Sequence, residues 1–310
     1  MSKPVIAIDM GGTRIKIGII QNESILASES IDAHSGRGLR QRLPFIQETV
    51  EGLLHQQGLS TNNIMGLGIA SPGIVDSIQK RILSIDKKFG DAPDIDLEEW
   101  CLQSFNLPFT IENDARSALL GEWKYGNAKS YENAVLMTLG TGVGSAAVME
   151  GQLLRGKHFT AGILGGHSVI NYKGNLCNCG NQGCVETEAS TWNLPVIAKT
   201  DHNFTLSELS SSPDYELVFK LAEEDDAAAK HLRNRSLQAW AACAVNLIHA
   251  YDPEILVLTG GIMASSPQIL PYIRQHIETH AWTPWGKVQI KEGAFPGTAA
   301  LFGIAHLVKN

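Results

Sequence analysis

The sequence predicts an α/β protein, and three observations lead to this class. Short β-branched runs of strand length end in acidic or glycine residues, as Val5–Asp9 does. Apolar residues at helical spacing in Leu39–Gln57 separate such runs from the next strand-like run, Ile64–Ala70. The opening pattern of a strand, a glycine turn and a strand then recurs from Ala134 onward. Strands that alternate with helices indicate crossover connections.

The first half of the chain opens with a predicted β-meander. Val5–Asp9, Ile15–Ile20 and Ile25–Ser28 are its strands, and the polar turn Gln21–Glu23 joins the last two. The further elements expected here are the helix Leu39–Gln57, the strand Ile64–Ala70, the strand Phe109–Glu112 and the helix Asp114–Trp123.

The second half begins with strands Ala134–Leu139 and Ala146–Met149 around a glycine turn. A surface loop rich in Ser, Asp and Thr is predicted at 200–214. The later elements are the helix Ala227–Ala250, the strand Ile255–Leu258 and the helix Ala299–Val308.

Length and charge narrow the class of protein. A chain of 310 residues with 44% hydrophobic and 18% charged residues can bury a large core, and about two globular domains are expected. The net charge of −7 and the lack of a basic run disfavour nucleic acid and anionic membranes, so we expect a small-molecule partner. Asp9 interrupts the first apolar run, and no run reaches about 18 apolar residues, which favours a cytoplasmic protein.

The first glycine turn follows the opening strand. Asp9 ends that strand, Gly11 and Gly12 come next, and Thr13 and Lys16 stand just beyond. Backbone N–H groups at such glycines can approach a phosphate, and the acid can hold Mg²⁺ or its water. The spacing differs from that of a P-loop, and no helix follows. A plain turn between two strands explains this motif equally well when it is taken alone.

A second glycine turn, Gly140–Gly144, repeats the arrangement, with Thr141 and Gly142 at its centre. Two such hairpins could clamp a triphosphate from both sides. A strand follows this turn, which disfavours a dinucleotide site because that site needs a helix there. Gly260 and Gly261 end a third strand and could lie flat against a nucleotide, although by themselves they indicate only a turn.

Two carboxylates and an amide mark the end of the strand Phe109–Glu112. Asn113 and Asp114 stand where this strand gives way to a helix, so Asp114 is expected to face a crevice at the carboxyl end of the sheet. We predict that Asp114 acts as a general base. The alternative, in which Asn113 or Asp114 only caps the helix, stays open on this motif alone.

The cysteines Cys177, Cys179 and Cys184 form a cluster, and His167 precedes them. Three thiolates and one imidazole make the closed tetrahedral set of a structural zinc site, whereas a catalytic zinc needs an open position. A disulfide is the alternative, but the odd total of five cysteines and the expected reducing compartment disfavour it.

In their order along the chain, these motifs resemble the ROK family of sugar kinases and related transcriptional repressors. The resemblance covers nearly the whole chain. The segments that carry it are Asp9–Lys16, Gly68–Asp76, Glu112–Ala115, Leu139–Gly144, His167 and Cys177–Glu186.

The resemblance implies an actin-like (ribonuclease H-like) ATPase fold, with two lobes and a cleft between them for sugar and ATP. We place the smaller lobe at 1–115 plus 291–310, and the larger lobe with the zinc-binding loop at 116–290. The implied activity is an ATP-dependent sugar kinase that transfers the γ-phosphoryl group to a hydroxyl, expected to be the 6-OH, of a hexose or hexose derivative. Mg²⁺, a structural Zn²⁺ and a homodimer are expected with it.

The same resemblance implies roles for single residues. Asp114 matches the catalytic base, and Asn113, His167 and Glu186 match sugar-contacting positions, so that His167 would serve both zinc and sugar. The positions that match the ATP site are Asp9, Gly11, Gly12, Thr13, Lys16, Gly140, Thr141, Gly142, Gly260 and Gly261.

The chain departs from the family pattern at two places. Family kinases commonly read Gly-Glu-(Ile or Leu)-Gly-His, with the Glu on sugar hydroxyls, whereas Gly162–His167 has no acid and an added glycine. The usual Asn-Leu-x-Gly-Trp loop is replaced by Ser84–Asp91, in which Asp86, Lys87 or Lys88 either contacts substrate or is a solvated charge. We therefore expect that unmodified glucose is not the best substrate.

Two other functions compete with the kinase: a catalytically weak, sugar-responsive regulator and a structural actin-like ATPase. The acid at Asp114 favours the enzyme over the regulator. The phosphate motif also begins at Asp9, which leaves no room ahead of it for the DNA-binding segment expected of a repressor. The zinc and sugar motifs disfavour a filament protein.

Overall fold

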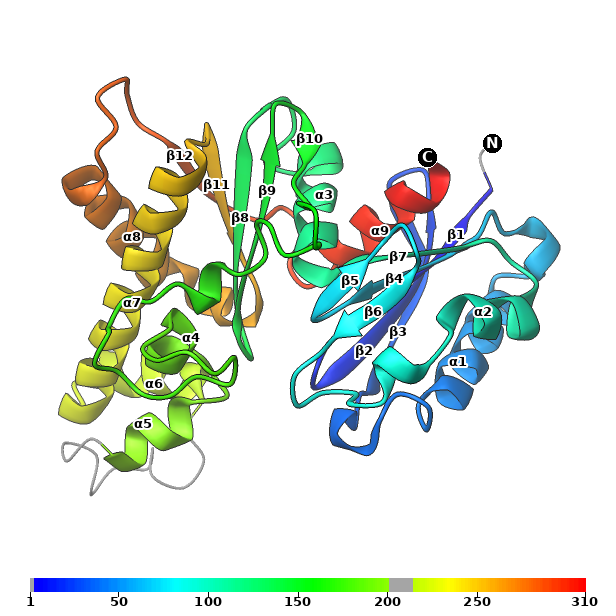
Figure 1. Ribbon diagram of the computed structural model, residues 1–310, viewed down its shortest axis with the longest axis horizontal. Coiled ribbons are helices and arrows are strands. Elements are labelled where there is room, and N and C mark those ends of the chain that lie inside the picture. The colour runs from blue at the N-terminus through cyan, green and yellow to red at the C-terminus, as the bar shows by residue number, and fades with distance from the viewer. Residues whose placement is uncertain (1–2, 201–213) are drawn as a thin grey trace. The chain divides into compact units, whose positions relative to one another are not determined.

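The computed structural model describes residues 3–200 and 214–310, so residues 201–213 of the predicted surface loop lie outside the described part. The chain forms two compact units, each built on a five-stranded sheet (Figure 1). The first unit consists of Met1–Lys129, Arg155–Ala161 and Thr298–Asn310, and the second of Ser130–Leu154 and Gly162–Gly297.

The sheet of the first unit has the strand order β3-β2-β1-β4-β7. An antiparallel meander makes one side of it, and β4 and β7 continue it in parallel with β1. These strands are β1 (Val5–Met10), β2 (Arg14–Gln21), β3 (Ser24–Asp32), β4 (Leu67–Ser71) and β7 (Phe109–Asn113). A separate two-stranded sheet consists of β5 (Ile74–Asp76) and β6 (Arg81–Ser84).

Helices cover both faces of this sheet, as Figure 1 shows. On one face, α1 (Leu43–Gln56) and α2 (Leu97–Phe105) bury apolar side chains together with β-strand residues such as Ile8. On the other face lie α3 (Asp114–Tyr125) and α9 (Ala299–Lys309), which pack on each other and on the strands. The inner strands β1 and β4 are buried from both sides, which explains why their sequences are nearly all apolar.

Helix α1 begins four residues later than the sequence predicts. The carboxylate of Asp91 accepts hydrogen bonds from the backbone N–H groups of Leu39 (2.5 Å) and Arg40 (3.0 Å). Asp91 therefore binds the backbone of Leu39 and Arg40, which the apolar periodicity had assigned to the helix, and these residues lie outside it.

The register of the parallel strands brings the predicted acidic residues to one edge. Asp9 pairs with Ala70, Ala70 pairs with Glu112, and Ser71 pairs with Asn113. Because these parallel strands end on the same side of the sheet, Asp9 and Asp114 lie at a common edge, where Asp114 directly follows Asn113.

The sheet of the second unit has the order β10-β9-β8-β11-β12, with β8, β11 and β12 parallel. Trp240 of the long helix α7 is fully buried in its core. The strands are β8 (Ala134–Leu139), β9 (Val143–Met149), β10 (Gln152–Leu153), β11 (Ile255–Thr259) and β12 (Gln289–Glu292). The helices are α4 (Val185–Ala189), α5 (Leu194–Thr200), α6 (Tyr215–Glu223), α7 (Ala227–Tyr251) and α8 (Ser266–His280).

The compact units differ from the expected lobe limits at three places. Helix α3 belongs to the first unit because it packs along α9. The short segment 155–161 also belongs to the first unit, whereas β12 pairs with β11 and belongs wholly to the second. In the part of the chain that the structure describes, none of the helices is both long and apolar enough to cross a membrane.

Candidate functional site

The first glycine turn joins β1 to β2 and packs against its own backbone. A Cβ atom at Gly11 would lie 2.6 Å from the carbonyl oxygen of Arg14, so only glycine fits there. The N–H of Gly11 donates to the carbonyl of Asp9 (3.2 Å), and the Ser35 hydroxyl donates to the carbonyl of Gly12 (2.7 Å). A cavity of about 450 Å³ opens beside this turn, lined by Gly12, Thr13, Asp32, His34, Ser35, Gly36 and Arg37.

Asp9 and Asp114 are close enough to influence each other. Burial raises the pKa of Asp9 to about 6, the Lys16 ammonium opposes this rise, and the Asp114 carboxylate adds to it. Burial also raises the pKa of Asp114, and the strongest opposing influence is the ammonium of Lys88. The edge of the sheet therefore holds two acids with raised pKa values and two lysines, which is the environment of a proton-accepting and cation-binding site.

Asn113 is the residue that caps α3. Its side-chain oxygen accepts from the N–H of Arg116 (3.1 Å), and its Nδ2 donates to the carbonyl of Gly73 (3.0 Å) and to Oδ1 of Asp114 (3.1 Å). The capping interpretation thus holds for Asn113, whereas Asp114 is the first residue of the helix. The amide of Asn113 orients the Asp114 carboxylate.

Lys88 is the residue of the loop Ser84–Asp91 that the structure brings to the turn. A Cβ at Gly12 would lie 2.6 Å from Cε and 3.2 Å from Nζ of Lys88, so the lysine side chain lies directly over Gly12. The next residue, Phe89, is fully buried, and its N–H donates to the carbonyl of Ser35 (2.7 Å). Asp86 and Lys87 are exposed.

A buried ion-pair network lies behind Asp114. The Glu112 carboxylate, which is fully buried, accepts from the N–H of Asn113 (2.8 Å), from Arg155 Nε (2.7 Å) and from Arg116 (3.4 Å). Arg116 also donates to the carbonyls of Arg155, Phe159 and Ala161. Every charge in the network has partners, so it fixes the strand end that carries Asn113 and Asp114. No sequence pattern predicted this clamp.

The second glycine turn, in the second unit, connects β8 to β9. The N–H of Gly140 donates to the carbonyl of Gly142 (3.0 Å), and the N–H of Val143 donates to Glu186 (2.9 Å). Gly260 lies beside this turn with φ of 103°, and a Cβ on it would lie 2.2 Å from the carbonyl oxygen of Leu139. The structure therefore brings together the residues Gly140, Thr141, Gly142, Gly260 and Gly261, all predicted for the ATP site.

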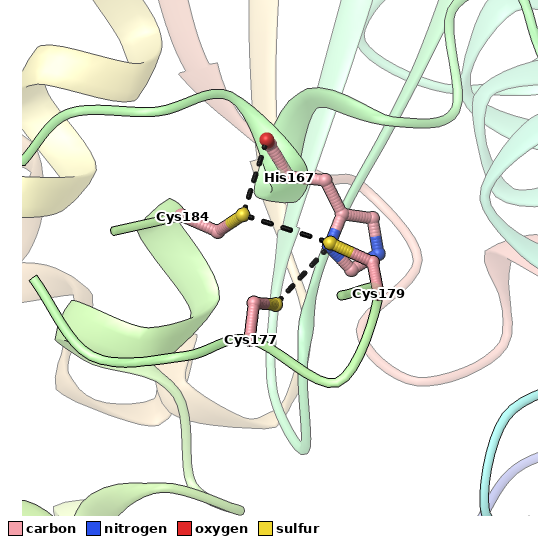
Figure 2. A group of neighbouring side chains, drawn as sticks. All are labelled: His167, Cys177, Cys179 and Cys184. Carbon is pink, nitrogen blue, oxygen red and sulfur yellow. Dashed lines mark hydrogen bonds between the residues drawn. The ribbon is translucent and has the colours of Figure 1, made fainter. Parts of the chain in front are cut away.

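His167 and the three cysteines converge on one point, as Figure 2 shows. Their four ligand atoms all lie within 4.8 Å of one another. The Cys179 and Cys184 sulfurs are 3.7 Å apart, and Cys177 Sγ is 3.6 Å from His167 Nδ1. A tetrahedral zinc with ordinary bond lengths requires about 3.8 Å between two sulfurs and about 3.6 Å between sulfur and nitrogen. The donor set and its spacing therefore fit zinc.

The residues that replace the missing family acid lie just before this cluster. Gly165–His167 forms one 3-10 turn, and a Cβ at Gly166 would lie 1.8 Å from the carbonyl oxygen of Val143. Ile163 is 9% exposed, whereas Leu164 is 44% exposed. Leu164 is therefore the apolar side chain of this segment that a ligand can reach.

The chain matches known proteins over almost all its length. The ROK family profile matches residues 5–310. The glucokinase of Thermotoga maritima is 28% identical, with 99% of this chain and 97% of that protein covered. The xylose repressor of Bacillus spizizenii is 27% identical, with 80% of this chain and 62% of the repressor covered.

Among solved structures, the ROK family glucokinase of Streptomyces griseus, in complex with glucose and AMPPNP, has a TM-score of 0.82. It is 24% identical, and 99% of each chain is covered. This likeness confirms the predicted α/β, actin-like ATPase fold. With a profile match from Val5 to the last residue, the chain belongs to the ROK family.

Proposed function

We propose that this protein is an ATP-dependent sugar kinase that transfers the γ-phosphoryl group to a hydroxyl, the 6-OH, of a hexose or hexose derivative. The observation that carries the proposal is the edge of the first sheet, where Asp114 has a raised pKa beside Asp9 and Lys88. A base of this kind, beside a cation and a glycine turn, suits phosphoryl transfer to an alcohol. The glucokinase relative supports the same activity.

In this mechanism the residues of the chain align the reacting groups and accept one proton. Asp114 accepts a hydrogen bond from the attacking sugar hydroxyl and finally takes its proton. The amide of Asn113 and the buried Glu112 hold Asp114 in place. Lys88 lies over Gly12, where its ammonium can balance negative charge that develops on the transferred group.

Beside the first glycine turn, Asp9 and Lys16 are proposed to lie near Mg²⁺ and phosphate, and the second glycine turn is proposed to contact phosphate as well. When bound, Mg²⁺ supplies positive charge to the phosphate oxygens. The N–H groups of Gly140 and Val143 already donate within the protein, which favours Thr141 and Gly142 as the residues of the second turn that meet phosphate. A homodimer also remains part of the proposal.

A coupled ADP-release assay over a panel of sugars tests the activity directly. Hexoses, hexosamines and N-acetyl sugars are each supplied with ATP and Mg²⁺, and ADP is measured. At least one of them should give ADP release that depends on both sugar and enzyme. Wild-type protein that releases no ADP with any of these sugars would contradict the kinase proposal.

The missing acid predicts the order of sugars within that panel. Neither Ile163 nor Leu164 can accept a hydrogen bond, and losing one bond between a sugar hydroxyl and a carboxylate costs about 1.5–3 kcal/mol, or roughly 10- to 150-fold in affinity. We expect a sugar with a different C1 or C2 arrangement, or with an apolar acetyl group near the exposed Leu164, to have a higher kcat/KM than glucose. Glucose, mannose, fructose, N-acetylglucosamine and N-acetylmannosamine are compared, and the hypothesis is wrong if glucose is clearly best.

Replacing Lys88 by Met is expected to lower kcat by about tenfold or more and to move the acid limb of the pH profile to higher pH. The sign follows from Asp114: the Lys88 ammonium lowers the pKa of its carboxyl, so losing that charge raises the pKa, and the base is protonated at a higher pH.

Lys87→Met is the matched control, because Lys87 is the exposed neighbour in the same loop. We expect it to keep the wild-type pH profile. A Lys88→Met enzyme with wild-type kcat and an unmoved acid limb would remove Lys88 from the site.

One observation supports a second function, a sugar-responsive regulator with weak catalysis: a relative named xylose repressor matches 80% of this chain. The two functions differ in turnover. A regulator would bind sugar, measured by calorimetry, but would release almost no ADP in the assay above.

A further inference from the structure

The residues just after the zinc-binding cysteines hold the second glycine turn. Helix α4 starts directly after Cys184, and Glu186 is its second residue. The Glu186 carboxylate uses both oxygens: Oε1 accepts from the N–H of Val143 (2.9 Å), and Oε2 accepts from the indole N–H of Trp192 (3.2 Å). Glu186 therefore joins the end of the zinc-binding loop to the glycine turn.

The backbone after α4 binds the same turn. The N–H of Thr191 donates to the carbonyl of Gly140 (3.2 Å), and the N–H of Trp192 donates to the carbonyl of Thr141 (3.1 Å). A Cβ at Gly142 would lie 2.4 Å from Oε1 of Glu186, so the turn rests directly on the carboxylate. Three residues of the predicted phosphate turn, Gly140, Thr141 and Gly142, therefore all contact this one segment.

The segment is itself anchored firmly. The Ser190 hydroxyl donates to the carbonyl of Glu186 (2.6 Å), and Asn193 Nδ2 donates to the carbonyl of Thr187 (2.6 Å). The indole N–H of the fully buried Trp240 donates to the carbonyl of Ala189 (2.8 Å). A segment fixed to the core in this way can impose one conformation on a glycine-rich turn, which otherwise loses much entropy when it orders.

We propose that Glu186 and Trp192 are positioning residues for nucleotide binding, and that the zinc-binding loop sets the conformation of the phosphate turn through them. The inference rests on the proposed function, because it takes the turn Gly140–Gly144 as part of the ATP site. It gives the zinc site an effect on the nucleotide, in addition to the effect on the sugar that His167 implies. The turn already has its binding conformation before ATP arrives, so the conformational entropy of ordering the turn does not reduce the affinity for ATP.

Nucleotide binding measured without sugar tests this inference. The probe is Mg²⁺ with AMPPNP, titrated by calorimetry into the full zinc-loaded chain. Trp192→Phe keeps an aromatic ring but removes the donor to Glu186, and we expect AMPPNP affinity to fall by about tenfold. Trp282→Phe, at a tryptophan that is 80% exposed in the same unit, is the matched control and should bind as the wild type does.

A second variant separates a lost hydrogen bond from a folding defect. Glu186→Gln can still accept from Val143 but presents an NH₂ group to the indole. It should weaken AMPPNP binding by a similar factor. The double variant, Trp192→Phe with Glu186→Gln, should bind AMPPNP no more weakly than either single variant, because each of the three proteins lacks the same hydrogen bond between the indole and the side chain at 186. Additive losses in the double variant would contradict the proposed pairing.

Zinc removal completes the test. Chelation should weaken AMPPNP binding to the wild type by at least as much as Trp192→Phe does, and it should add less in that variant, where the connection is already broken. A wild type that binds no AMPPNP would overturn the kinase proposal itself. A wild type that binds AMPPNP, with equal affinity in both single variants and after chelation, would overturn only this inference.

Discussion

An Asp114→Asn enzyme is expected to lose about 10²-fold or more in kcat while its fold and its ATP affinity stay nearly unchanged. The amide cannot accept the proton of the attacking hydroxyl. It can still accept the hydrogen bond that the Asp114 carboxylate takes from the N–H of Ala115 (2.8 Å), so α3 should still form. Steady-state kinetics, circular dichroism and AMPPNP titration together check this prediction.

The pH profile gives the same experiment a second readout. Because Asp114 must be ionised to act as a base, wild-type kcat should fall as pH drops through its raised pKa, above the usual range of an aspartate. The remaining activity of Asp114→Asn should lack this acid limb. A variant with near wild-type kcat, or with an unchanged acid limb, would show that another group is the base.

The second large effect is expected from the residues proposed to bind zinc. Cys184→Ser should abolish zinc binding and lower the free energy of unfolding by about 3 kcal/mol or more, because a serine hydroxyl does not replace a buried thiolate ligand. Elemental analysis should find one zinc per wild-type chain and none in the variant. Acid should release zinc from the wild type, since the ligands then bind protons.

Cys243→Ser is the matched control for this prediction. Cys243 is also fully buried in the second unit, but it lies on α7, apart from the cluster of His167, Cys177, Cys179 and Cys184. It should lose some stability and keep its zinc. The proposal that this loop binds zinc is wrong if wild-type protein contains no zinc and is active. It is also wrong if Cys177→Ser and Cys184→Ser both leave stability and KM unchanged.

Elements with a strong local pattern could be predicted from the sequence. The strand Ala134–Leu139 has the predicted bounds, and the long helix α7 extends one residue beyond its predicted end. Helix α8 could not be predicted as easily. Its buried stripe of Ile269, Ile273 and Ile277 has helical spacing, but Pro271 lies inside it, and proline usually breaks a helix. Packing of the stripe on the core overrides that preference.

The candidate site divides in the same way. Each glycine turn and the cysteine cluster occupy a short stretch of sequence, so these motifs could be recognised from the sequence alone. Lys88 lies over Gly12 only because the chain folds back on itself. Trp192 is just six residues from Glu186, but no sequence motif marks these two side chains as hydrogen-bonded. The buried network of Glu112, Arg116 and Arg155 is hidden because Arg155 comes from a distant segment, and because the four residues from Glu112 to Arg116 cross from a strand into a helix.

The packing of α9 on α3 has a consequence for synthesis on the ribosome. A Cβ at Gly303 would lie 1.8 Å from the carbonyl oxygen of Ser117, and one at Gly121 would lie 2.1 Å from that of Ala299, so the two helix backbones touch. The ribosome synthesises the residues of α3 long before it synthesises residues 298–310. The first unit therefore has to wait until the second unit has been translated, and until then the part of its sheet that α9 covers stays exposed. Chaperone binding should be most important during that interval.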